Sequence, residues 1–444
     1  MDLAQALRLP LPASYHTVSL VGAGGKTTAL FQLAQSLIQH GAPSVILTNT
    51  THLGDWQVAM AEHHVVAEDL PTLQDIPFSG ITLVTGGFDH GRVRPVNENV
   101  LTWLRENCRA KNIPLLIEAD GSRQKSLKAP AAHEPPIPEF SDTVIVVAGL
   151  SVLGKPLTDE HVHRAEVFST LGELPLGQPV DPETLGRVLA HPQGGLKNIP
   201  PHARRVVLLN QADTPALRSI GGNLASTLLD AFDSVIVSAL QKNSFQTFEQ
   251  TAGIILAAGK ATRFGAPKQI LDWKGKPFVR QVAETALHSG LWPVVVVTGA
   301  FSADVESALS NLPVKIIHNP NYTQGQSTSI RAGIEVISRQ AGAAIFLLAD
   351  QPQIPTEVIR ALVETHTRDL SPIIAPLVLE EKRANPVLFD RVTFPSLLNI
   401  TGDVGGRAIF SDYKVEYLPW HDDRLLLDVD KPEDYQRLVE DETL

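Results

Sequence analysis

Short apolar runs recur along this chain, each followed by a longer stretch in which apolar and polar positions mix. The first half contains TVSLVG, SVILTN, ITLVTGG, LLIEADG, TVIVVAG, RVVLLN and SVIVSAL, and the second contains GIILAAG, PVVVVTG, VKIIHN, AAIFLLAD and PIIAPLV. Runs this apolar suit strands that are buried on both faces, so they predict parallel sheets covered by helices. The pattern therefore predicts an α/β fold throughout.

A polar stretch separates the two series of runs. It reads QKNSFQTFEQTAG, covers residues 241–253, and has the composition of a linker. We therefore predict two domains, 1–245 and 250–444: first a parallel α/β domain, then a doubly wound domain with a mostly parallel sheet. Two domains suit 444 residues, because one domain usually holds about 100–200. The halves do not resemble each other, which indicates a fusion and not an internal repeat.

Charge and cysteine content exclude several classes of protein. The net charge of −11 argues against a general binder of nucleic acid or anionic membranes, although local cations suffice for one nucleotide. Cys108 is the single cysteine, so no intrachain disulfide or cysteine-based metal site is expected. The first residues lack the pattern of a signal peptide, and no apolar run reaches the ~20 residues of a membrane span. We expect a cytoplasmic protein without a membrane partner.

The segment LAAGKATRFGAPK follows the first strand of the second series. Its small residues would let a triphosphate come close to the backbone, and Arg263 and Lys268 would supply positive charge. An ordinary turn between a strand and a helix is the alternative, but here the glycines, Arg and Lys follow a buried strand in a fixed order. The residues predicted to contact the nucleotide here are Leu256, Ala257, Ala258, Gly259 and Lys268.

This segment resembles the signature of nucleotidyltransferases, which activate a phosphorylated acceptor with an NTP and release pyrophosphate. Within that class it is most similar to the molybdenum cofactor cytidylyltransferase group of the MobA-like family. The resemblance extends over the C-terminal half. It implies a Rossmann-like nucleotidyltransferase domain that depends on Mg²⁺.

Two acidic segments support a metal site. Asp350 ends the run AAIFLLAD, and catalytic groups in open α/β sheets lie at such strand ends. The resemblance implies that Asp350 holds Mg²⁺, while a cap on the next helix is the alternative. LLLDVDKPEDYQRL resembles the closing segment of the family, with Lys431 where Thr is usual, and implies Asp430 as second ligand with Asp428 as its alternative. Magnesium prefers such oxygen ligands.

Three further segments resemble parts of the same family. NYTQGQSTSIRAGI would contact the base and ribose through Gly325, Ser327 and Ser329, or would simply cap a helix. RANPVLFD and TGDVGGRAIF would line the acceptor side, although two plain turns are the alternative. The expected acceptor-binding residues are Asn385, Asp403 and Arg407.

The predicted reaction follows from charge. An acceptor phosphate attacks the α-phosphorus of the NTP, and Lys268, Arg263 and Asp350 are the catalytic residues that offset the repulsion between two anions. The methyl group of Ala258 would crowd a purine, so CTP is the expected nucleotide, and a molybdopterin-type cofactor is the expected acceptor. A guanylyltransferase on the same acceptor, or a cytidylyltransferase of an isoprenoid or sugar phosphate, is the alternative.

A second phosphate-binding loop lies near the N-terminus, in TVSLVGAGGKTTALFQLAQSL. The loop is shorter than the standard P-loop and is similar to that of Mur ligases. Backbone N–H groups and a helix start would cradle phosphates, with Lys26 on the terminal phosphates and Thr27 near Mg²⁺. A glycine-rich turn without a ligand is the alternative. The residues predicted to bind ATP or GTP here are Gly22, Gly24, Gly25, Lys26, Thr27 and Thr28.

Other strand ends of the first half fit a nucleotide site. LLIEADGS offers Glu118 and Asp120 as acids on the metal side. VVLLNQAD resembles the guanine-reading segment of GTPases, so Asn210 and Asp213 would contact guanine. Gln211 replaces the usual Lys, which leaves the choice between ATP and GTP open.

The first half also resembles the YqeC family of selenium-dependent hydroxylase accessory proteins. The resemblance lies in GAGGKTT, TGGFDHGR, EADGSRQKSLKAPAAHEPPIP, GLSVLGKPL, HVHRAEVF and NQAD. We hypothesise an NTP-using accessory domain for a molybdenum hydroxylase or its maturation factors, or else a nucleotide-gated binding module or chaperone without turnover. His133, His161 and His163 lie in these segments, and we assign no metal to them.

Overall fold

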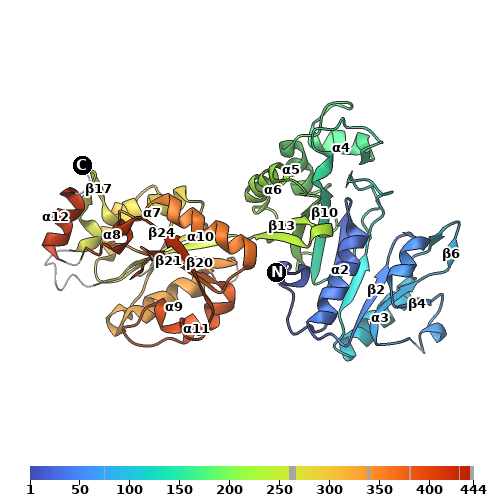
Figure 1. Ribbon diagram of the computed structural model, residues 1–444, viewed down its shortest axis with the longest axis horizontal. Helices are drawn as coiled ribbons and strands as arrows, with labels where there is room; N and C mark the ends of the chain where they lie inside the picture. The colour runs from blue at the N-terminus through green and yellow to red at the C-terminus, as the bar shows by residue number, and fades with distance from the viewer. Residues whose placement is uncertain (75, 260–266, 338–340, 380–381, 430, 441–444) are drawn as a thin grey trace. The chain divides into compact units, whose positions relative to one another are not determined.

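The computed structural model describes the chain except for residues 75, 260–266, 338–340, 380–381, 430 and 441–444. It divides into two compact units, Met1–Phe248 and Glu249–Leu444 (Figure 1). Within the described ranges, no helix combines the length and apolarity needed to cross a bilayer.

The described part of the first unit is built on a nine-stranded sheet. Neighbouring strands are parallel except for β13 and β14, which lie at one edge of the sheet and are antiparallel. In spatial order the strands are β14 (Ser244–Phe248), β13 (Ser234–Ala239), β12 (Arg204–Asn210), β10 (Thr143–Gly149), β1 (Thr17–Gly22), β8 (Leu115–Glu118), β2 (Ser44–Asn49), β5 (Gly80–Thr85) and β4 (His63–Val66).

Helices cover both faces of this sheet, as the apolar strands require. In β1, Val18 and Leu20 join one hydrophobic core with α1 and α2, whereas Val21 joins the other with the remaining helices. The helices are α1 (Leu3–Ala6), α2 (Lys26–Gln39), α3 (Glu98–Ala110), α4 (Ala165–Gly172), α5 (Pro182–Ala190) and α6 (Pro215–Leu228). Short strands form two small sheets: β9 (Leu127–Lys128) with β11 (Val162–His163), and β3 (Leu53–Gly54) with β7 (Arg92–Val93) and β6 (Phe88–Asp89).

An eight-stranded sheet forms the centre of the described part of the second unit. Four consecutive strands, β19, β18, β15 and β20, are parallel, and β24 is parallel to β21, whereas β23 runs antiparallel to both of its neighbours. The order is β19 (Lys315–His318), β18 (Val294–Thr298), β15 (Thr251–Ala257), β20 (Ala343–Leu348), β23 (Val387–Asp390), β21 (Ile373–Val378) and β22 (Lys382–Arg383), with β24 (Val415–Trp420) beside β21.

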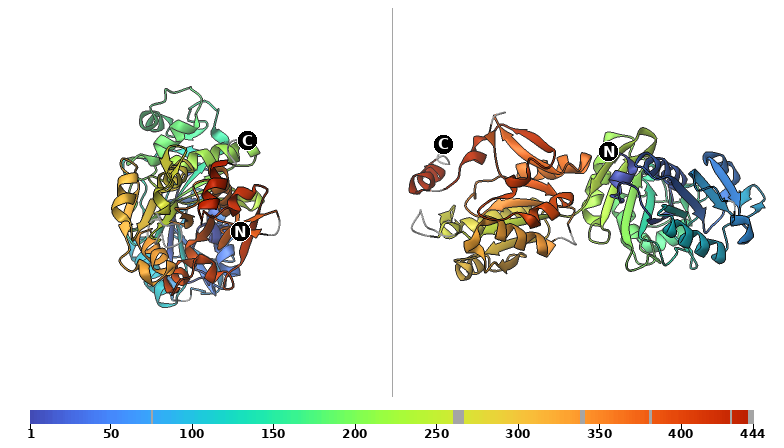
Figure 2. Two further views of the ribbon diagram at one scale, coloured as in Figure 1. Left: turned by 90° about the vertical axis from the view of Figure 1, so that its left-hand side faces the viewer. Right: turned by 90° about the horizontal axis from the view of Figure 1, so that it is seen from below.

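The chain winds in both directions from β15, because β18 and β19 follow on one side and β20 lies on the other. Figure 1 shows α7, α8 and α10 on one face and α9 and α11 on the other, and Figure 2 shows the same layers from two more sides. The helices are α7 (Phe278–His288), α8 (Ser302–Ala308), α9 (Gln326–Ile337), α10 (Thr356–Asp369), α11 (Phe394–Asn399) and α12 (Pro432–Glu440), and β16 (Asp272–Trp273) pairs with β17 (Lys276–Pro277). A ligand crevice is expected where the winding reverses, at the carboxyl ends of β15 and β20.

The predicted α/β class with mostly parallel sheets is confirmed. The predicted linker is partly wrong, because β14 occupies residues 244–248 and β15 begins at Thr251. The predicted end of the first domain at residue 245 falls inside β14. This strand alternates buried Phe245 and Thr247 with half-buried neighbours, two of which are polar, which is the pattern of an edge strand and not of an apolar run.

Candidate functional site

A cavity of about 560 Å³ lies at the reversal point of the second sheet. The ends of β15 and β20 form its floor, and the segment before α9 forms one side. The predicted nucleotide loop and the predicted metal ligand therefore meet in one place. The lining residues are Leu256, Ala258, Gly259, Lys268, Gln269, Tyr322, Thr323, Gln324, Gly325, Gln326, Ser329, Leu348, Ala349, Asp350 and Asp403.

Lys268 and Asp350 face each other in this cavity. The Lys268 Nζ atom lies 3.8 Å from Asp350 Oδ2, and the two side chains are 17% and 31% exposed. The alternative role of Asp350 as a helix cap is wrong for α10, since that helix begins at Thr356 and Pro355 occupies its cap position. Asp350 thus lines the cavity beside a cation.

Gln269 closes the predicted nucleotide loop, a role that the sequence did not reveal. Its buried amide donates hydrogen bonds to the carbonyl oxygens of Ala257, at 3.1 Å, and Gly259, at 3.0 Å. The end of the loop is therefore fastened to its beginning. Arg263, the second predicted cation, lies outside the described residues.

Asp428 lies close to the segment of Asp350, because Gln351 donates a hydrogen bond to its carboxylate. Asp430, the preferred second metal ligand, lies outside the described residues. In the described part of the chain, no group of three or more His, Cys, Asp or Glu side chains is arranged to hold a metal. One or two carboxylates together with substrate phosphates are nevertheless the usual ligands of magnesium, so the donor set fits that ion.

The predicted ribose and base contacts lie at the start of α9, and they fall into two groups: some line the cavity and one does not. Gly325 and Ser329 line the cavity, and Ser329 also accepts a hydrogen bond of 3.0 Å from Asn319. Ser327 does not line it: its buried hydroxyl donates to the carbonyl oxygen of Gly402 at 2.7 Å. Ser327 therefore fastens two loops together.

The predicted acceptor residues also fall into two groups, those that line the cavity and those that do not. Asp403 lines the cavity and accepts a hydrogen bond of 3.2 Å from the backbone N–H of Gln326. Asn385 and Arg407 are not among the lining residues but contact each other, with Arg407 Nη2 lying 3.4 Å from Asn385 Oδ1. Only Asp403 of the three reaches the cavity wall.

In the first unit, the glycine-rich loop joins β1 to α2, and Lys26 is the first helical residue. Gly22, Gly24 and Gly25 have φ angles of 92°, 89° and 125°, which side chains rarely adopt. A Cβ atom on Gly22 would lie 2.2 Å from the carbonyl oxygen of Val147. Glycine is therefore required by both conformation and space.

The polar groups of this loop are bonded within the protein. Lys26 Nζ donates to the carbonyl oxygen of Gly22 at 2.9 Å and lies 3.7 Å from the carboxylate of Glu118. The hydroxyl of Thr27 donates to Glu118 at 3.0 Å, while Thr28 is exposed. Burial raises the pKa of Glu118, although the nearby ammonium of Lys26 opposes that effect.

Asp120, the other acid that the sequence suggested for the metal side, contacts the glycine-rich loop directly. One of its oxygens accepts a hydrogen bond of 3.0 Å from the N–H of Gly22, and the other pairs with Lys128. Both acids therefore have partners in the fold, Gly22 and Lys128 for Asp120, and Thr27 and Lys26 for Glu118, so the metal-side role of each stays a prediction.

Asn210 anchors the loop. Its side-chain NH₂ donates to the carbonyl oxygen of Gly24 at 2.8 Å, and its side-chain oxygen accepts hydrogen bonds of 3.2 Å from Ser238 and Leu240. Asp213, the other predicted guanine contact, is exposed and lies 3.7 Å from Lys242. The buried Asn210 thus holds backbone segments together.

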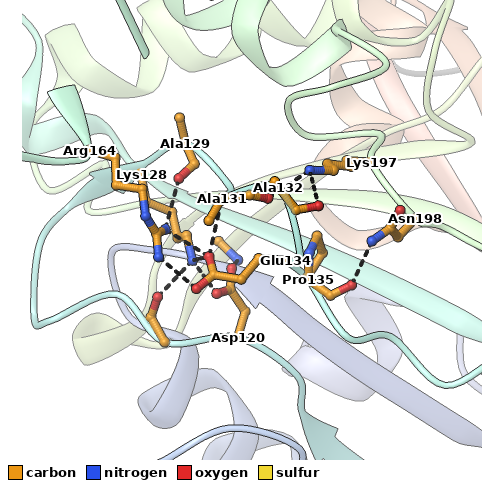
Figure 3. Close-up of polar contacts among 12 residues, drawn as sticks. Asp120, Lys128, Ala129, Ala131, Ala132, Glu134, Pro135, Arg164, Lys197 and Asn198 are labelled. Atoms are coloured by element: carbon orange, nitrogen blue, oxygen red, sulfur yellow. Dashed lines mark hydrogen bonds and ion pairs between the residues drawn. The ribbon is translucent and has the colours of Figure 1, made fainter. Parts of the chain in front are cut away.

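An ion-pair network lies beside the loop (Figure 3). Lys128 contacts Asp120 and Glu134, and Arg164 donates two hydrogen bonds of 2.7 Å to Glu134. Burial alone would raise the pKa of Glu134, but the hydrogen bonds from Arg164 and Lys128 lower it to about 2. The sequence placed Lys128, Glu134 and Arg164 in YqeC-like segments without assigning them a role.

Comparisons with known proteins identify both units. The model of the YqeC protein family matches residues 18–166, and that of the MobA-like NTP transferase domain matches residues 253–417. "Uncharacterized protein YqeC" of Escherichia coli K12 is 35% identical over 200 residues, which are 44% of this chain and 75% of that protein. The chain joins a YqeC domain to a MobA-like NTP transferase domain.

Two relatives match the MobA-like domain. "Nicotine blue oxidoreductase" of Paenarthrobacter nicotinovorans is 30% identical over 198 residues, 42% of this chain and 95% of that protein. "Probable molybdenum cofactor guanylyltransferase" of Bacillus cereus AH187 is 29% identical over 133 residues, 30% of this chain and 64% of that protein. Relatives of the MobA-like domain thus carry names from two classes of enzyme.

Proposed function

We propose that the MobA-like domain transfers CMP from CTP to the phosphate of a molybdopterin-type cofactor and releases pyrophosphate. The observation that carries this proposal is the placement of Lys268 beside Asp350 in one cavity with the loop of Ala258 and Gly259. The name of the Bacillus cereus relative supports a molybdenum cofactor as the acceptor.

In the proposed reaction, a phosphate oxygen of the acceptor forms a bond to the α-phosphorus while the bond to pyrophosphate breaks. Both reactants are anions, so the barrier includes their repulsion, which the ammonium of Lys268 and the guanidinium of Arg263 reduce. The backbone at Ala258 and Gly259 holds the triphosphate in line with the acceptor. A magnesium ion held by Asp350 and Asp430, or by Asp428 in place of Asp430, would supply further positive charge between the two anions.

Acceptor recognition is assigned to the segment of Asp403, which lies beside the start of α9. Asp403 would hydrogen-bond a neutral donor group of the acceptor, and the contact between Arg407 and Asn385 would place a cation near its phosphate. Gly325 and Ser329 would contact the ribose and base.

The test is pyrophosphate release with molybdopterin cofactor and each of CTP, GTP, ATP and UTP. We expect release with CTP, and its loss in Asp350→Asn. Asp369→Asn is the matched control, because Asp369 is an exposed carboxylate at the end of α10, outside the cavity. Equal release by Asp350→Asn and wild type would remove Asp350 from the mechanism. A preference for GTP would indicate the guanylyltransferase, and release only with isoprenoid or sugar phosphates would reject the molybdopterin acceptor.

The name of the Paenarthrobacter relative favours a second candidate, an oxidoreductase. Such an enzyme would consume NADH or NADPH with a dye-like acceptor and would release no pyrophosphate. Loss of NADPH absorbance, measured with the same protein preparation, separates the two functions. Oxidation without pyrophosphate release would replace the transferase proposal.

For the YqeC domain we propose binding of ATP or GTP at the loop of Gly22, Gly24, Gly25, Lys26, Thr27 and Thr28. The left-handed glycines and the position of Lys26 at the start of α2 support it. A nucleotide would draw Lys26 away from Glu118, leaving that acid and Thr27 for magnesium. The domain would then serve maturation of a molybdenum hydroxylase, as an NTPase or as a nucleotide-gated binding module.

Nucleotide binding and hydrolysis by wild type and Lys26→Ala separate these versions. Binding lost in the variant supports the loop, and hydrolysis lost with it supports an NTPase. If neither protein hydrolyses the nucleotide but wild type alone binds it, the result supports a binding module without turnover. Equal binding by both would place the nucleotide elsewhere.

A further inference from the structure

The YqeC domain also has a cavity at the edge of its sheet opposite to the glycine-rich loop. Its volume of about 540 Å³ is within the range of small-molecule sites. His16 and Asp142, which line it, directly precede the first residues of β1 and β10. The glycine-rich loop starts at the other end of β1, whose six residues place its two ends about 16 Å apart. The cavity is therefore separate from the proposed nucleotide site.

Hydrogen bonds fix the side of the cavity that adjoins the sheet. The carboxylate of Asp142 accepts a hydrogen bond of 2.8 Å from the backbone N–H of Thr17, and the N–H of Asp142 donates one of 3.0 Å to the Thr17 carbonyl oxygen. His16 Nε2 lies 2.9 Å from the hydroxyl oxygen of Thr143. These groups would need no rearrangement when a ligand binds, which lowers the cost of binding.

Two arginines of α3 line the same cavity. Arg105 and Arg109 are four residues apart, so their side chains lie on one face of the helix. In the parts of the chain that the structure describes, neither guanidinium makes a hydrogen bond or an ion pair. Arg105 is half-buried, and its guanidinium lies 4.7 Å from the centre of the Phe140 ring, which orients it. Both guanidiniums are therefore available to a ligand in the cavity.

The acidic residues of the cavity do not neutralise these arginines. Glu139 and Asp142 also line it, yet neither of these carboxylates lies within 4.0 Å of a nitrogen atom of either guanidinium. Asp142 is bonded to Thr17 instead, and Glu139 is exposed. The cavity thus contains two positive charges that the described residues leave unpaired, and such charges favour an anionic ligand.

Tyr15 supplies a further hydrogen-bond donor to this cavity. Its phenolic oxygen accepts a hydrogen bond of 3.1 Å from the hydroxyl of Thr17, and among the described residues its own O–H has no acceptor. The backbone N–H of Tyr15 donates to the side-chain oxygen of Asn112 at 3.0 Å, which holds the residue in place. Guanidinium and hydroxyl groups are the donors that phosphate oxygens accept from, and one guanidinium can bind two such oxygens at once.

We propose that this cavity binds a phosphate group, with Arg105 and Arg109 as its cationic ligands and Tyr15 as a further donor. The phosphate is either free or carried by a small organic molecule, for which the cavity has room. The site is independent of nucleotide binding at the glycine-rich loop and of the transfer reaction in the MobA-like domain. Failure of any one of these proposals therefore leaves the others standing.

Phenylglyoxal, which modifies unprotected guanidiniums, tests the site in the full-length protein. Mass spectrometry of peptides measures the modification rate of each arginine separately, so phosphate bound elsewhere in the chain does not disturb the readout. At about ten times its Kd, inorganic phosphate should slow the modification of Arg105 and Arg109 by about 10-fold, because few sites are then empty. Arg92 is the internal control, since it is exposed on β7, outside the cavity, and its rate should not change.

Substitutions show whether the two arginines bind one ligand. Arg109→Gln should raise the phosphate concentration that protects Arg105 by at least about 10-fold, because a charged hydrogen-bonding partner of the phosphate is lost. Arg105→Gln should do the same to the protection of Arg109. Arg92→Gln is the matched control, because it removes the same charge outside the cavity and should leave both protections intact. Since Arg109 is exposed, its substitution leaves the fold unchanged.

Ribose 5-phosphate and AMP identify the source of the phosphate. If either protects Arg105 and Arg109 at a lower concentration than inorganic phosphate does, the cavity also contacts the organic part of its ligand. If inorganic phosphate protects at the lowest concentration, the site binds free phosphate. Both results support the site. Unchanged modification of Arg105 and Arg109 with all three ligands, or equal protection of Arg105 in wild type and Arg109→Gln, would overturn the proposal.

Discussion

Two carboxylates two residues apart, Glu118 and Asp120, have different roles because their partners differ. Glu118 contacts Lys26 and Thr27, where phosphates would compete with it for Lys26 and a metal would bind its carboxylate. Asp120 is committed to the Gly22 N–H and to Lys128, so it shapes the loop. Spacing along the sequence could not separate these roles, since the partners come from distant segments.

At the base pocket, one methyl group should decide nucleotide choice. Ala258 lines the cavity, whereas Ala257 points into the hydrophobic core. Ala258→Gly should raise kcat/KM for GTP relative to CTP by about 10-fold, the scale of one carbon in a binding pocket. Pyrophosphate release with both nucleotides measures this ratio.

Ala257→Gly is the control for that change, because it removes a core methyl and leaves the pocket intact. It should lower the stability of the domain and leave the ratio of kcat/KM for GTP to that for CTP unchanged. An unchanged ratio in Ala258→Gly would mean that another group selects the base.

The half-buried carboxylate of Glu134 should make the free energy of unfolding depend on pH in acid. Its pKa of about 2 lies below the usual 4.5, so its contribution is present above pH 4.5 and is lost as the pH falls towards 2. Glu134→Gln should therefore destabilise the YqeC domain by about 3 kcal/mol at pH 6. By pH 3.5 the difference should shrink by about 1.4 kcal/mol.

Urea unfolding of both proteins, followed by hydrogen exchange of peptides from this domain, measures the difference. A difference that stays constant between pH 6 and pH 3.5 would show that Glu134 does not titrate as described. Glu183→Gln is the control, since that carboxylate is exposed and paired with Arg187 on the helix surface.

At the scale of elements, Asn210 connects the end of β12 to the glycine-rich loop and to the end of β13. Asn210→Ala would leave buried backbone groups of Gly24 and Leu240 without partners. We expect a loss of about 2–4 kcal/mol in the free energy of unfolding. ATP and GTP binding should weaken together, because the loop itself is disturbed.

Calorimetric titration with ATP and GTP tests this role. Asp213→Ala is the comparison. It should leave the stability unchanged, and it should weaken the binding of GTP but not of ATP if Asp213 contacts guanine. A selective loss of GTP in Asn210→Ala, with normal stability, would restore the reading of Asn210 as a base contact.

The sequence predicted those elements whose cause is local. Apolar runs such as β1 and β15 were found because strands buried on both faces must be apolar. β24 was missed because its residues are mostly half-buried and polar residues interrupt it. Gln269 and the network around Glu134 were missed for another reason: each links segments that only the folded chain brings together.

At the scale of the whole molecule, the connection between the two units is short. Phe248 ends β14, and Gln250 already accepts a hydrogen bond of 2.9 Å from Gly342 in the second unit. Each unit has its own cores, so we propose that each folds alone when the chain is divided after Phe248.

Fragments test that boundary. Residues 1–248 should fold with the stability of this unit in the full chain, and 249–444 should retain full pyrophosphate release. Residues 1–245 should be less stable by about 3 kcal/mol, because the pairing of β14 with β13 beyond Phe245 is lost. The buried Thr247 hydroxyl, which donates to the carbonyl oxygen of Ala6 at 3.1 Å, is lost as well. Urea unfolding of fragments 1–248 and 1–245 measures this difference. Equal stability of the two would mean that the last residues of β14 belong to a linker.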